Sequence, residues 1–206
     1  MTEDPTDPYA TLRDDEYLGP LIDEHGELTV DPAEDFFARF VTSILRQQVS
    51  MASAAATRER LFDAVAVTPE GILDAEEATL RDAGLSRQKT RYVRNVAEAF
   101  VDGLSRASLA ELDDAAARER LTDITGVGEW TANVQLIFSL GREDVFPVGD
   151  LGVRKGMARL FDLDVEDRAE MVDRAERWRP YRTYATLYCW RVEEDIADSV
   201  AEVIRE

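Results

Sequence analysis

The chain has 206 residues and a mass of 23.2 kDa, with 45% hydrophobic and 33% charged residues, which is enough for one sizeable core or two small lobes. Its composition excludes a membrane helix and a signal peptide, and the single cysteine, Cys189, excludes an internal disulfide, a multi-cysteine zinc site and an iron–sulfur cluster, so we expect a cytoplasmic protein. The 24 Lys and Arg against 43 Asp and Glu give a net charge of −19, a balance that repels nucleic acid.

Helical patterns dominate the chain from Pro32 onward, and this proline suits a first helical turn. Apolar residues then recur at the i, i+3, i+4, i+7 spacing of one buried helical face. These residues are Phe37, Phe40, Val41, Ile44, Leu45 and Val49. An alanine-rich helix is expected over 51–65, and a further helix begins where Thr68 can act as a cap with Pro69 just inside it.

The next helices follow in quick succession. A short helix that holds Leu80 ends at Gly84, and longer helices are expected over 86–100 and from about 108 to 124. Strand signals are scarce, and residues 28–30 could make at most a short edge strand. We therefore expect an all-α protein of roughly nine or ten helices.

Two glycines separated by one residue, Gly126-Val127-Gly128, lie between two helical patterns. This spacing predicts a tight hairpin whose second helix begins at once, with its free N–H groups directed outward. Such amides suit a phosphate, so an acidic protein can bind DNA through its backbone without a basic side chain. The alternative is an ordinary helical turn that ends on glycine.

Asp150 lies 22 residues after Gly128, at the point where a further helix opens between a glycine and an apolar run. An aspartate in this position is commonly an N-cap. It can equally be a carboxylate that serves chemistry, and the local pattern alone does not decide between the two.

Together, the hairpin and this aspartate resemble the helix-hairpin-helix DNA glycosylase superfamily, whose signature is such a hairpin followed at this distance by a loop with Gly or Pro and one Asp. Residues 43–50 are similar to the helix end and loop that enter the minor groove, and 84–89 to the family's glycine turn before a basic helix start. Residues 178–190 look like the closing helix of the 3-methyladenine (AlkA-type) branch. The resemblance covers about 31–190.

The resemblance implies an all-α, two-lobed helix-hairpin-helix glycosylase fold with a cleft between the lobes. Residues 33–142 are expected to form the lobe that carries the hairpin. Residues 1–32 and 143–206 are expected to form a second, discontinuous lobe.

The resemblance also implies an activity. Asp150 matches the residue that serves cleavage of the bond between base and sugar, and a carboxylate there stabilises an oxocarbenium-like sugar and can activate water. An alkylated base already carries positive charge and leaves without protonation. Strand-nicking members carry a lysine where this chain has Trp130, so the implied activity is monofunctional release of alkylated purines from damaged double-stranded DNA, in base excision repair, by a monomer.

Three further residues match positions around the damaged base. Trp130 and Trp190 match tryptophans that line the base pocket of this branch, where electron-rich faces suit a cationic base, although either indole can be ordinary core. Gln48 matches the residue that fills the gap left by the flipped base, or else it is a solvated helix end. Val134 and Leu151 stand where the branch can have aromatic residues, which predicts a wider pocket.

The remaining candidate contacts to DNA fall on the hairpin and on basic side chains, although each basic side chain can equally belong to a solvated face with local salt bridges. The hairpin candidates are Thr125, Gly126, Val127, Gly128 and Thr131, and the basic ones are Arg46, Lys89 and Arg154. The resemblance implies a monovalent cation on the backbone carbonyls of Ile124 and Val127, no required cofactor and no iron–sulfur cluster.

Several alternatives stay open at this point. The chain can be a glycosylase for uracil or oxidised bases, which needs extra hydrogen-bond donors in its pocket, or a hairpin protein that binds distorted DNA without cutting it. His25 lies between carboxylates, either in a polar turn or at a metal site. The acidic surface, with Lys89 and Lys155 as the two lysines, fits either a cytoplasm held at high salt or an ordinary acidic protein.

Overall fold

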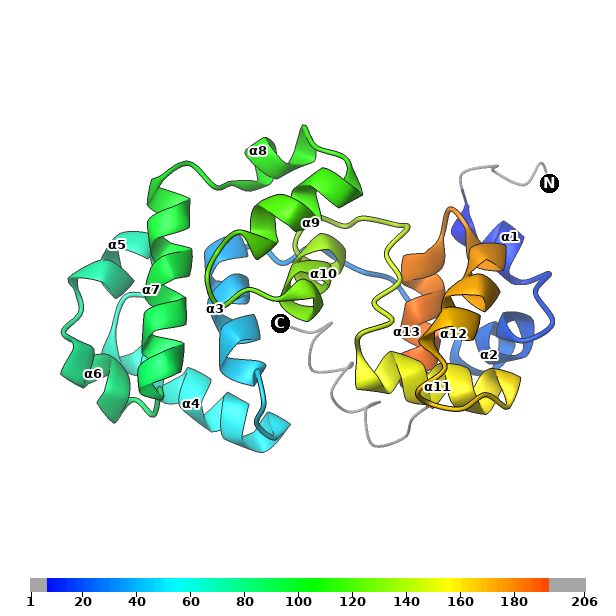
Figure 1. The fold of residues 1–206 in the computed structure, drawn as a ribbon, viewed down its shortest axis with the longest axis horizontal. Helices are drawn as coiled ribbons and strands as arrows, with labels where there is room; N and C mark the ends of the chain where they lie inside the picture. Colours follow the sequence, from blue (N-terminus) through cyan, green and yellow to red (C-terminus); the bar gives the residue numbers. More distant parts are fainter. Residues whose placement is uncertain (1–6, 193–206) are drawn as a thin grey trace. The chain divides into compact units, whose positions relative to one another are not determined.

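The computed structural model describes residues 7–192, within which every regular element is a helix (Figure 1). The all-α class expected from the sequence is therefore confirmed. Contacts divide the chain between residues 31 and 32 and between residues 140 and 141. We call 32–140 the continuous unit, and the segments before and after it the split unit; the expected boundaries lie within two residues of this division. No helix among the described residues is long and apolar enough to cross a bilayer.

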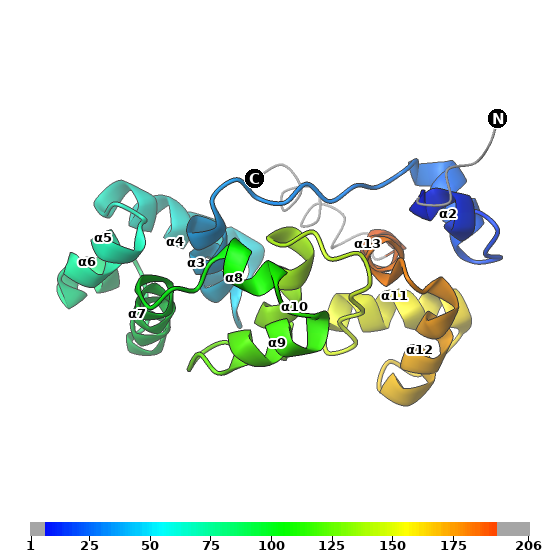
Figure 2. The ribbon, with the colours of Figure 1, turned by 90° about the horizontal axis from the view of Figure 1, so that it is seen from above.

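The continuous unit is arranged around α3, which contacts α4, α7 and α10, and Figures 1 and 2 both show α7 alongside α5. Its helices are α3 (Phe36–Arg46), α4 (Met51–Ala64), α5 (Pro69–Asp74), α6 (Glu77–Asp82), α7 (Arg87–Val101), α8 (Arg106–Ala110), α9 (Asp114–Thr122) and α10 (Glu129–Phe138).

Two kinds of contact fix α3 in this unit. Phe36, Phe37 and Phe40 surround Phe100 of α7, with ring centroids 4.9 to 6.0 Å apart. On the α10 side, the amide of Gln135 donates to Ser43 Oγ at 2.8 Å and accepts from Ser139 Oγ at 2.7 Å. Because these buried polar groups are hydrogen-bonded to one another, the bonds offset the cost of removing them from water and help to hold α10 against α3.

The split unit joins two short helices near the start of the chain to three helices and a 3-10 turn near its end. They are α1 (Pro8–Leu12), α2 (Leu18–His25), α11 (Leu151–Phe161), α12 (Arg168–Ala175), the 3-10 turn η1 (Glu176–Trp178) and α13 (Arg182–Val192). In Figures 1 and 2 α11 lies beside α13. Gly156 permits this approach, because a Cβ there would lie 2.1 Å from the carbonyl oxygen of Cys189.

Some of the acidic residues of this chain are N-caps that stabilise the first turns of helices. Five helices begin at an aspartate whose carboxylate accepts a backbone N–H from the first turn, an arrangement that satisfies an otherwise unpaired donor and complements the helix dipole. The five residues are Asp7, Asp35, Asp113, Asp150 and Asp167.

Two of these caps also correct the expected helix boundaries. The helix expected from Pro32 begins at Phe36, since Asp35 accepts the Ala38 N–H at 2.9 Å. The single helix expected over about 108–124 is two helices, α8 and α9, because Asp113 starts a new one. Such breaks explain why residues 7–192 hold thirteen α-helices, more than the nine or ten expected.

The short edge expected at residues 28–30 is not a strand. Tyrosine side chains take the backbone groups that a neighbouring strand would need. The Tyr188 hydroxyl donates to the Gly26 carbonyl at 2.6 Å and accepts the Leu28 N–H at 3.3 Å, and the Tyr9 hydroxyl donates to the Leu28 carbonyl.

Candidate functional site

The hairpin expected at Gly126-Val127-Gly128 joins α9 to α10. Gly126 adopts a φ of +105°, which favours glycine, and the Val127 N–H donates to the Ile124 carbonyl at 2.9 Å. Gly128 is the extended N-cap of α10, and no side chain caps this helix. The start of α10 is the positive end of the helix dipole and has no capping side chain, which is the arrangement that suits an anion.

Three side chains from other helices hold the hairpin, and the sequence pattern assigned none of them this role. Asn95 of α7 donates to the Thr125 carbonyl at 2.8 Å. Gln47 donates from one nitrogen to the Gly126 carbonyl at 3.0 Å and to Thr131 Oγ1 at 2.9 Å. The Tyr92 ring lies against Gly126, where a Cβ would come within 2.2 Å of the ring.

The turn after α3 presents Gln48 as an exposed side chain. Gln48 has a φ of +58°, a left-handed conformation that is uncommon outside glycine. Its neighbour Val49 is 43% exposed, which is unusual for an apolar side chain. Gln48 thus lies at the tip of an exposed turn. This position fits a residue that fills the gap left by a flipped base, and it equally fits a solvated helix end.

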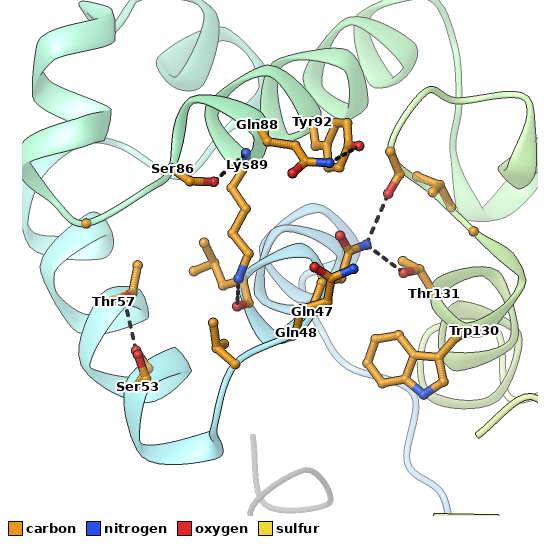
Figure 3. Close-up of a pocket in the computed structure, with 16 residues that line it drawn as sticks. Gln47, Gln48, Ser53, Thr57, Ser86, Gln88, Lys89, Tyr92, Trp130 and Thr131 are labelled. Atoms are coloured by element: carbon orange, nitrogen blue, oxygen red, sulfur yellow. Dashed lines mark hydrogen bonds between the residues drawn. The ribbon is translucent and has the colours of Figure 1, made fainter. Parts of the chain in front are cut away.

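A groove of about 790 Å³ brings the hairpin and this turn together within the continuous unit (Figure 3). It includes Gly126, Val127 and Gly128, together with Gln47, Gln48, Ser53, Thr57, Ser86, Gln88, Lys89, Tyr92, Trp130 and Thr131. None of its described lining residues is acidic. Segments 36–58 and 83–97, which supply much of the lining, contain no Asp or Glu in a chain that has 43. Since no acidic side chain lines the groove, a phosphate is repelled less strongly there than over the rest of the acidic surface.

The basic candidates differ in what they contact. The Lys89 ammonium reaches from α7 to the Leu45 carbonyl at the end of α3, and burial lowers the pKa of this lysine (Figure 3). Arg46 is the half-buried last residue of α3. Arg154 corrects the expectation: it is only 8% exposed and bonds to the Val165 carbonyl and to Glu166 Oε1 at 3.0 and 2.7 Å, so its side chain is directed into its own unit.

Asp150 lies at the start of α11 in the split unit. Its Oδ1 accepts the Val153 N–H at 2.9 Å, which makes it the N-cap of the helix, and also accepts Trp190 Nε1 at 2.9 Å. Trp190 is 6% exposed and comes from α13. The half-buried carboxylate is thus fixed by a backbone donor and by an indole donor, so capping does not prevent it from being a fixed negative charge.

Trp130 is in the first turn of α10, is half-buried and lines the groove (Figure 3). Beside it, Thr131 is 1% exposed and accepts from Gln47, so the Thr131 side chain supports the turn. Thr125 is exposed at the tip of the hairpin, and Leu151 is 52% exposed.

The hairpin and the turn around His25 are two places where the sequence offers ligands for a cation. The Ile124 carbonyl accepts one N–H, which leaves a second lone pair for a hard cation, so the donor chemistry of the hairpin fits a monovalent ion. His25 ends α2, and no group of three His, Cys, Asp or Glu suited to a metal occurs among the described residues.

The fold is that of a helix-hairpin-helix protein: one helical unit carries the hairpin, and the other carries the fixed carboxylate of Asp150. The chain belongs to the HhH-GPD superfamily of base excision DNA repair proteins, whose family model matches residues 41–180. The resemblance drawn from the sequence is thereby confirmed.

Individual relatives agree with this assignment. DNA-3-methyladenine glycosylase 1 of Schizosaccharomyces pombe is 35% identical over 130 residues, 62% of this chain and 57% of the relative. The structure of the 3-methyladenine DNA glycosylase of the same yeast, in complex with abasic DNA, matches with a TM-score of 0.81 and 28% identity over 89% of this chain and 95% of that chain. The DNA-3-methyladenine glycosidase structure of Bacillus halodurans matches with a TM-score of 0.82 and 32% identity over 96% and 93% of the two chains.

The chain is shorter than curated relatives. The matched region spans 64% of the length of a Bacillus subtilis relative, 57% of a Schizosaccharomyces pombe relative and 34% of a Mycobacterium tuberculosis relative.

Proposed function

We propose that this protein is a monofunctional DNA glycosylase that hydrolyses the N-glycosidic bond of alkylated purines, of the 3-methyladenine type, in double-stranded DNA during base excision repair. It acts in the cytoplasm as a monomer and requires no cofactor for the chemistry. The family and the names of the relatives support this class of substrate.

The observation that carries the proposal is the fixed carboxylate of Asp150. As the base leaves with the bonding electrons, the sugar gains positive charge, and a carboxylate already oriented by Val153 N–H and Trp190 Nε1 stabilises that charge without reorganising. Water then adds to the sugar carbon, and its proton passes to the carboxylate or to solvent. The base and an abasic site are the products.

The continuous unit supplies the grip on DNA. The uncapped first turn of α10 offers amides to a phosphate, and Gly128 leaves open space in front of them, since a Cβ there would meet nothing within 4 Å. The groove carries Gln48 at an exposed tip, where its amide can occupy the gap left by a flipped base.

Trp130 supports both the monofunctional and the alkyl-base parts of the proposal. An indole cannot form a Schiff base with the abasic sugar, so strands are left intact. Its half-buried ring at the groove offers a π face to a cationic base, worth about 0.5 to 2 kcal/mol over the neutral parent base. Trp190 contributes through its N–H to Asp150.

A monovalent cation at the Ile124 and Val127 carbonyls is part of the proposal. Such an ion would hold the hairpin in shape and add positive charge next to a phosphate. DNA affinity measured in potassium, sodium and tetramethylammonium chloride at one ionic strength tests it, and equal affinity in all three salts would exclude the ion.

Base release from methylated duplex DNA, followed by chromatography, tests the activity. Wild type, Asp150→Asn and Asp167→Asn are compared in low and high potassium chloride. Asparagine keeps an oxygen for the helix cap but removes the charge, so Asp150→Asn should lose activity by about 100-fold or more. Asp167 caps α12 in the same unit and is the matched control, with wild-type activity expected.

Release of methylated purines by wild type and Asp167→Asn, with strands intact until alkali is added, is the expected result. Strand breaks without alkali would contradict the monofunctional part. No release by folded wild type in either salt would overturn the alkyl-base proposal. Duplexes that contain uracil or an oxidised base would then show whether the protein is a glycosylase for another lesion or a protein that only binds distorted DNA.

A further inference from the structure

Gln47 is the one residue between the end of α3 and the exposed Gln48 tip, and its side chain reaches the hairpin. Its Nε2 donates to the Gly126 carbonyl at 3.0 Å and to Thr131 Oγ1 at 2.9 Å, 79 and 84 residues away in the chain. Figure 3 shows the two bonds spanning the groove wall from the turn to the hairpin. The side-chain nitrogen of Gln47 thus bonds both to the loop of the hairpin and to the first turn of α10, the helix that follows it.

The turn that Gln47 tethers contains a residue with an uncommon backbone conformation. Gln48 has a φ of +58°, and a non-glycine residue in this region is retained only where the surroundings hold it. Lys89 holds the other side of the turn through the Leu45 carbonyl. The Gln48 tip is therefore held between α7 and the hairpin.

We propose that Gln47 is a positioning residue that couples the hairpin to the Gln48 turn, so that gripping the DNA backbone and inserting Gln48 into the duplex occur as one movement. The inference rests on the proposed function, because it assigns a step to the same site. Without the tether, the hairpin still binds phosphate, but the turn is free to adopt conformations that do not insert, and fewer bound complexes hold a flipped base.

The tether can be removed with little change of volume. Gln47→Met keeps the length of the side chain and loses its N–H donors. Thr68→Val is the matched control for the loss of one side-chain hydrogen bond in the continuous unit: Thr68 caps α5 outside the groove, where its hydroxyl accepts the Gly71 N–H at 3.0 Å. Thr131→Val removes one of the two acceptors and is a second test should Gln47→Met fail to fold, as judged by circular dichroism.

Insertion is measured apart from chemistry. A duplex with 2-aminopurine beside a stable abasic-site analogue reports unstacking by its fluorescence, and anisotropy with the same and with an undamaged duplex reports affinity. The Gln48→Ala variant, which lacks the inserting side chain, gives the 2-aminopurine fluorescence expected without insertion. Single-turnover base release from methylated DNA gives the rate at saturation and the half-saturating protein concentration separately.

For Gln47→Met we expect the 2-aminopurine signal at saturation to fall about threefold or more, and the saturated rate of base release to fall about tenfold. Affinity for undamaged duplex and the half-saturating concentration should change by less than about twofold, because the hairpin amides remain. Thr131→Val should move the same quantities in the same direction by less, and Thr68→Val should match wild type per folded molecule.

A wild-type 2-aminopurine signal in folded Gln47→Met, or in folded Thr131→Val if the first variant does not fold, would overturn the proposal. So would equal losses in Thr68→Val, or a loss confined to affinity for undamaged DNA. If wild type releases no base, the proposed activity fails, yet the fluorescence comparison still decides whether Gln47 couples hairpin and turn.

Discussion

A single carboxylate oxygen of Asp150 accepts two hydrogen bonds, from a backbone amide and from the Trp190 indole. The first bond satisfies a donor at the start of α11, and the second comes from a side chain 40 residues later. At the scale of the residue, Trp190 is thus a positioning residue for Asp150 as well as a candidate wall of the base site. The two functions can be separated, because phenylalanine keeps an aromatic face and loses the N–H donor.

Trp190→Phe should lower the saturated rate of base release by about tenfold, since an unsupported carboxylate reorganises during the reaction. The half-saturating DNA concentration should stay near that of wild type. Trp178→Phe is the control: Trp178 is fully buried in the same unit, and its Nε1 has no hydrogen-bond partner. It should lower the free energy of unfolding by about 1 to 3 kcal/mol and keep the rate per folded molecule. Equal rate losses in both variants would show that packing alone matters.

Cys189 gives a second prediction at this scale. The side chain is buried in α13, and burial raises the pKa of its thiol to about 12, above the ordinary value of 9.0 for an exposed thiol. Between these values the unfolded chain loses the thiol proton and the native protein keeps it. Stability conferred by this group is therefore complete below about pH 9 and is lost as pH rises, by up to about 1.4 kcal/mol per pH unit.

Urea unfolding of wild type and Cys189→Ala at pH 8, 9 and 10 checks this slope. The free energy of unfolding should fall less steeply in the variant, while shifts from buried tyrosines are common to both proteins. A thiol reagent at pH 8.5 should label wild type only as fast as the protein unfolds. Parallel slopes, or rapid labelling of native protein, would contradict the assignment.

At the scale of the element, the two hairpin glycines have different functions despite their symmetric place in the motif. Gly126 has a positive φ and lies against Tyr92, so the fold itself requires it. Gly128 has a φ of −92° and open space where a Cβ would be, so the fold does not require it. An approaching phosphate does require that space.

Gly126→Ala should lower the free energy of unfolding by about 2 kcal/mol or more, because the new Cβ is strained and meets the Tyr92 ring. Gly128→Ala should change stability by less than about 1 kcal/mol but weaken DNA binding by about tenfold. Urea unfolding and anisotropy with an abasic-analogue duplex measure both quantities in both variants. Unchanged DNA affinity in Gly128→Ala would show that no phosphate binds in the space beside Gly128.

The whole molecule has a net charge of −19, so the proposed binding of DNA has to work against repulsion between like charges. The acidic residues are unevenly placed, since segments 36–58 and 83–97 have none and supply much of the groove. Within the described lining, Lys89 is the charged side chain, and its ammonium already contacts a carbonyl. In the proposed complex, neutral amides and backbone N–H groups therefore carry more of the binding than basic side chains do.

This distribution predicts a weak dependence of affinity on salt. With about two or three phosphates neutralised by basic side chains, the slope of log K against log potassium chloride should be no steeper than about −3. Titration of the abasic-analogue duplex by anisotropy across a range of potassium chloride concentrations gives the slope. A value near −6 or steeper would show that several arginines contact phosphates and that the groove does not act as described.

Features that depend on neighbouring residues in the chain were predictable. The helices over 51–65 and 86–100, the hairpin, and a helix that opens at Asp150 follow from apolar spacing, glycine and capping residues, which act over a few positions. The boundary at Asp35 and the break at Asp113 were missed because several nearby residues can cap or start a helix, and local patterns rank them poorly.

The sequence by itself determined the helical class, the family, and the segments that carry Gln48, the hairpin and Asp150. Only the tertiary structure decided what the side chains contact: Gln47 with the hairpin, Trp190 with Asp150, Lys89 with Leu45 and Arg154 with Glu166. Helix spacing records which face of an element is buried, whereas these partners lie 12 to 79 residues apart and meet only when helices pack. A polar side chain that bonds across such distances leaves no periodic signal in the sequence.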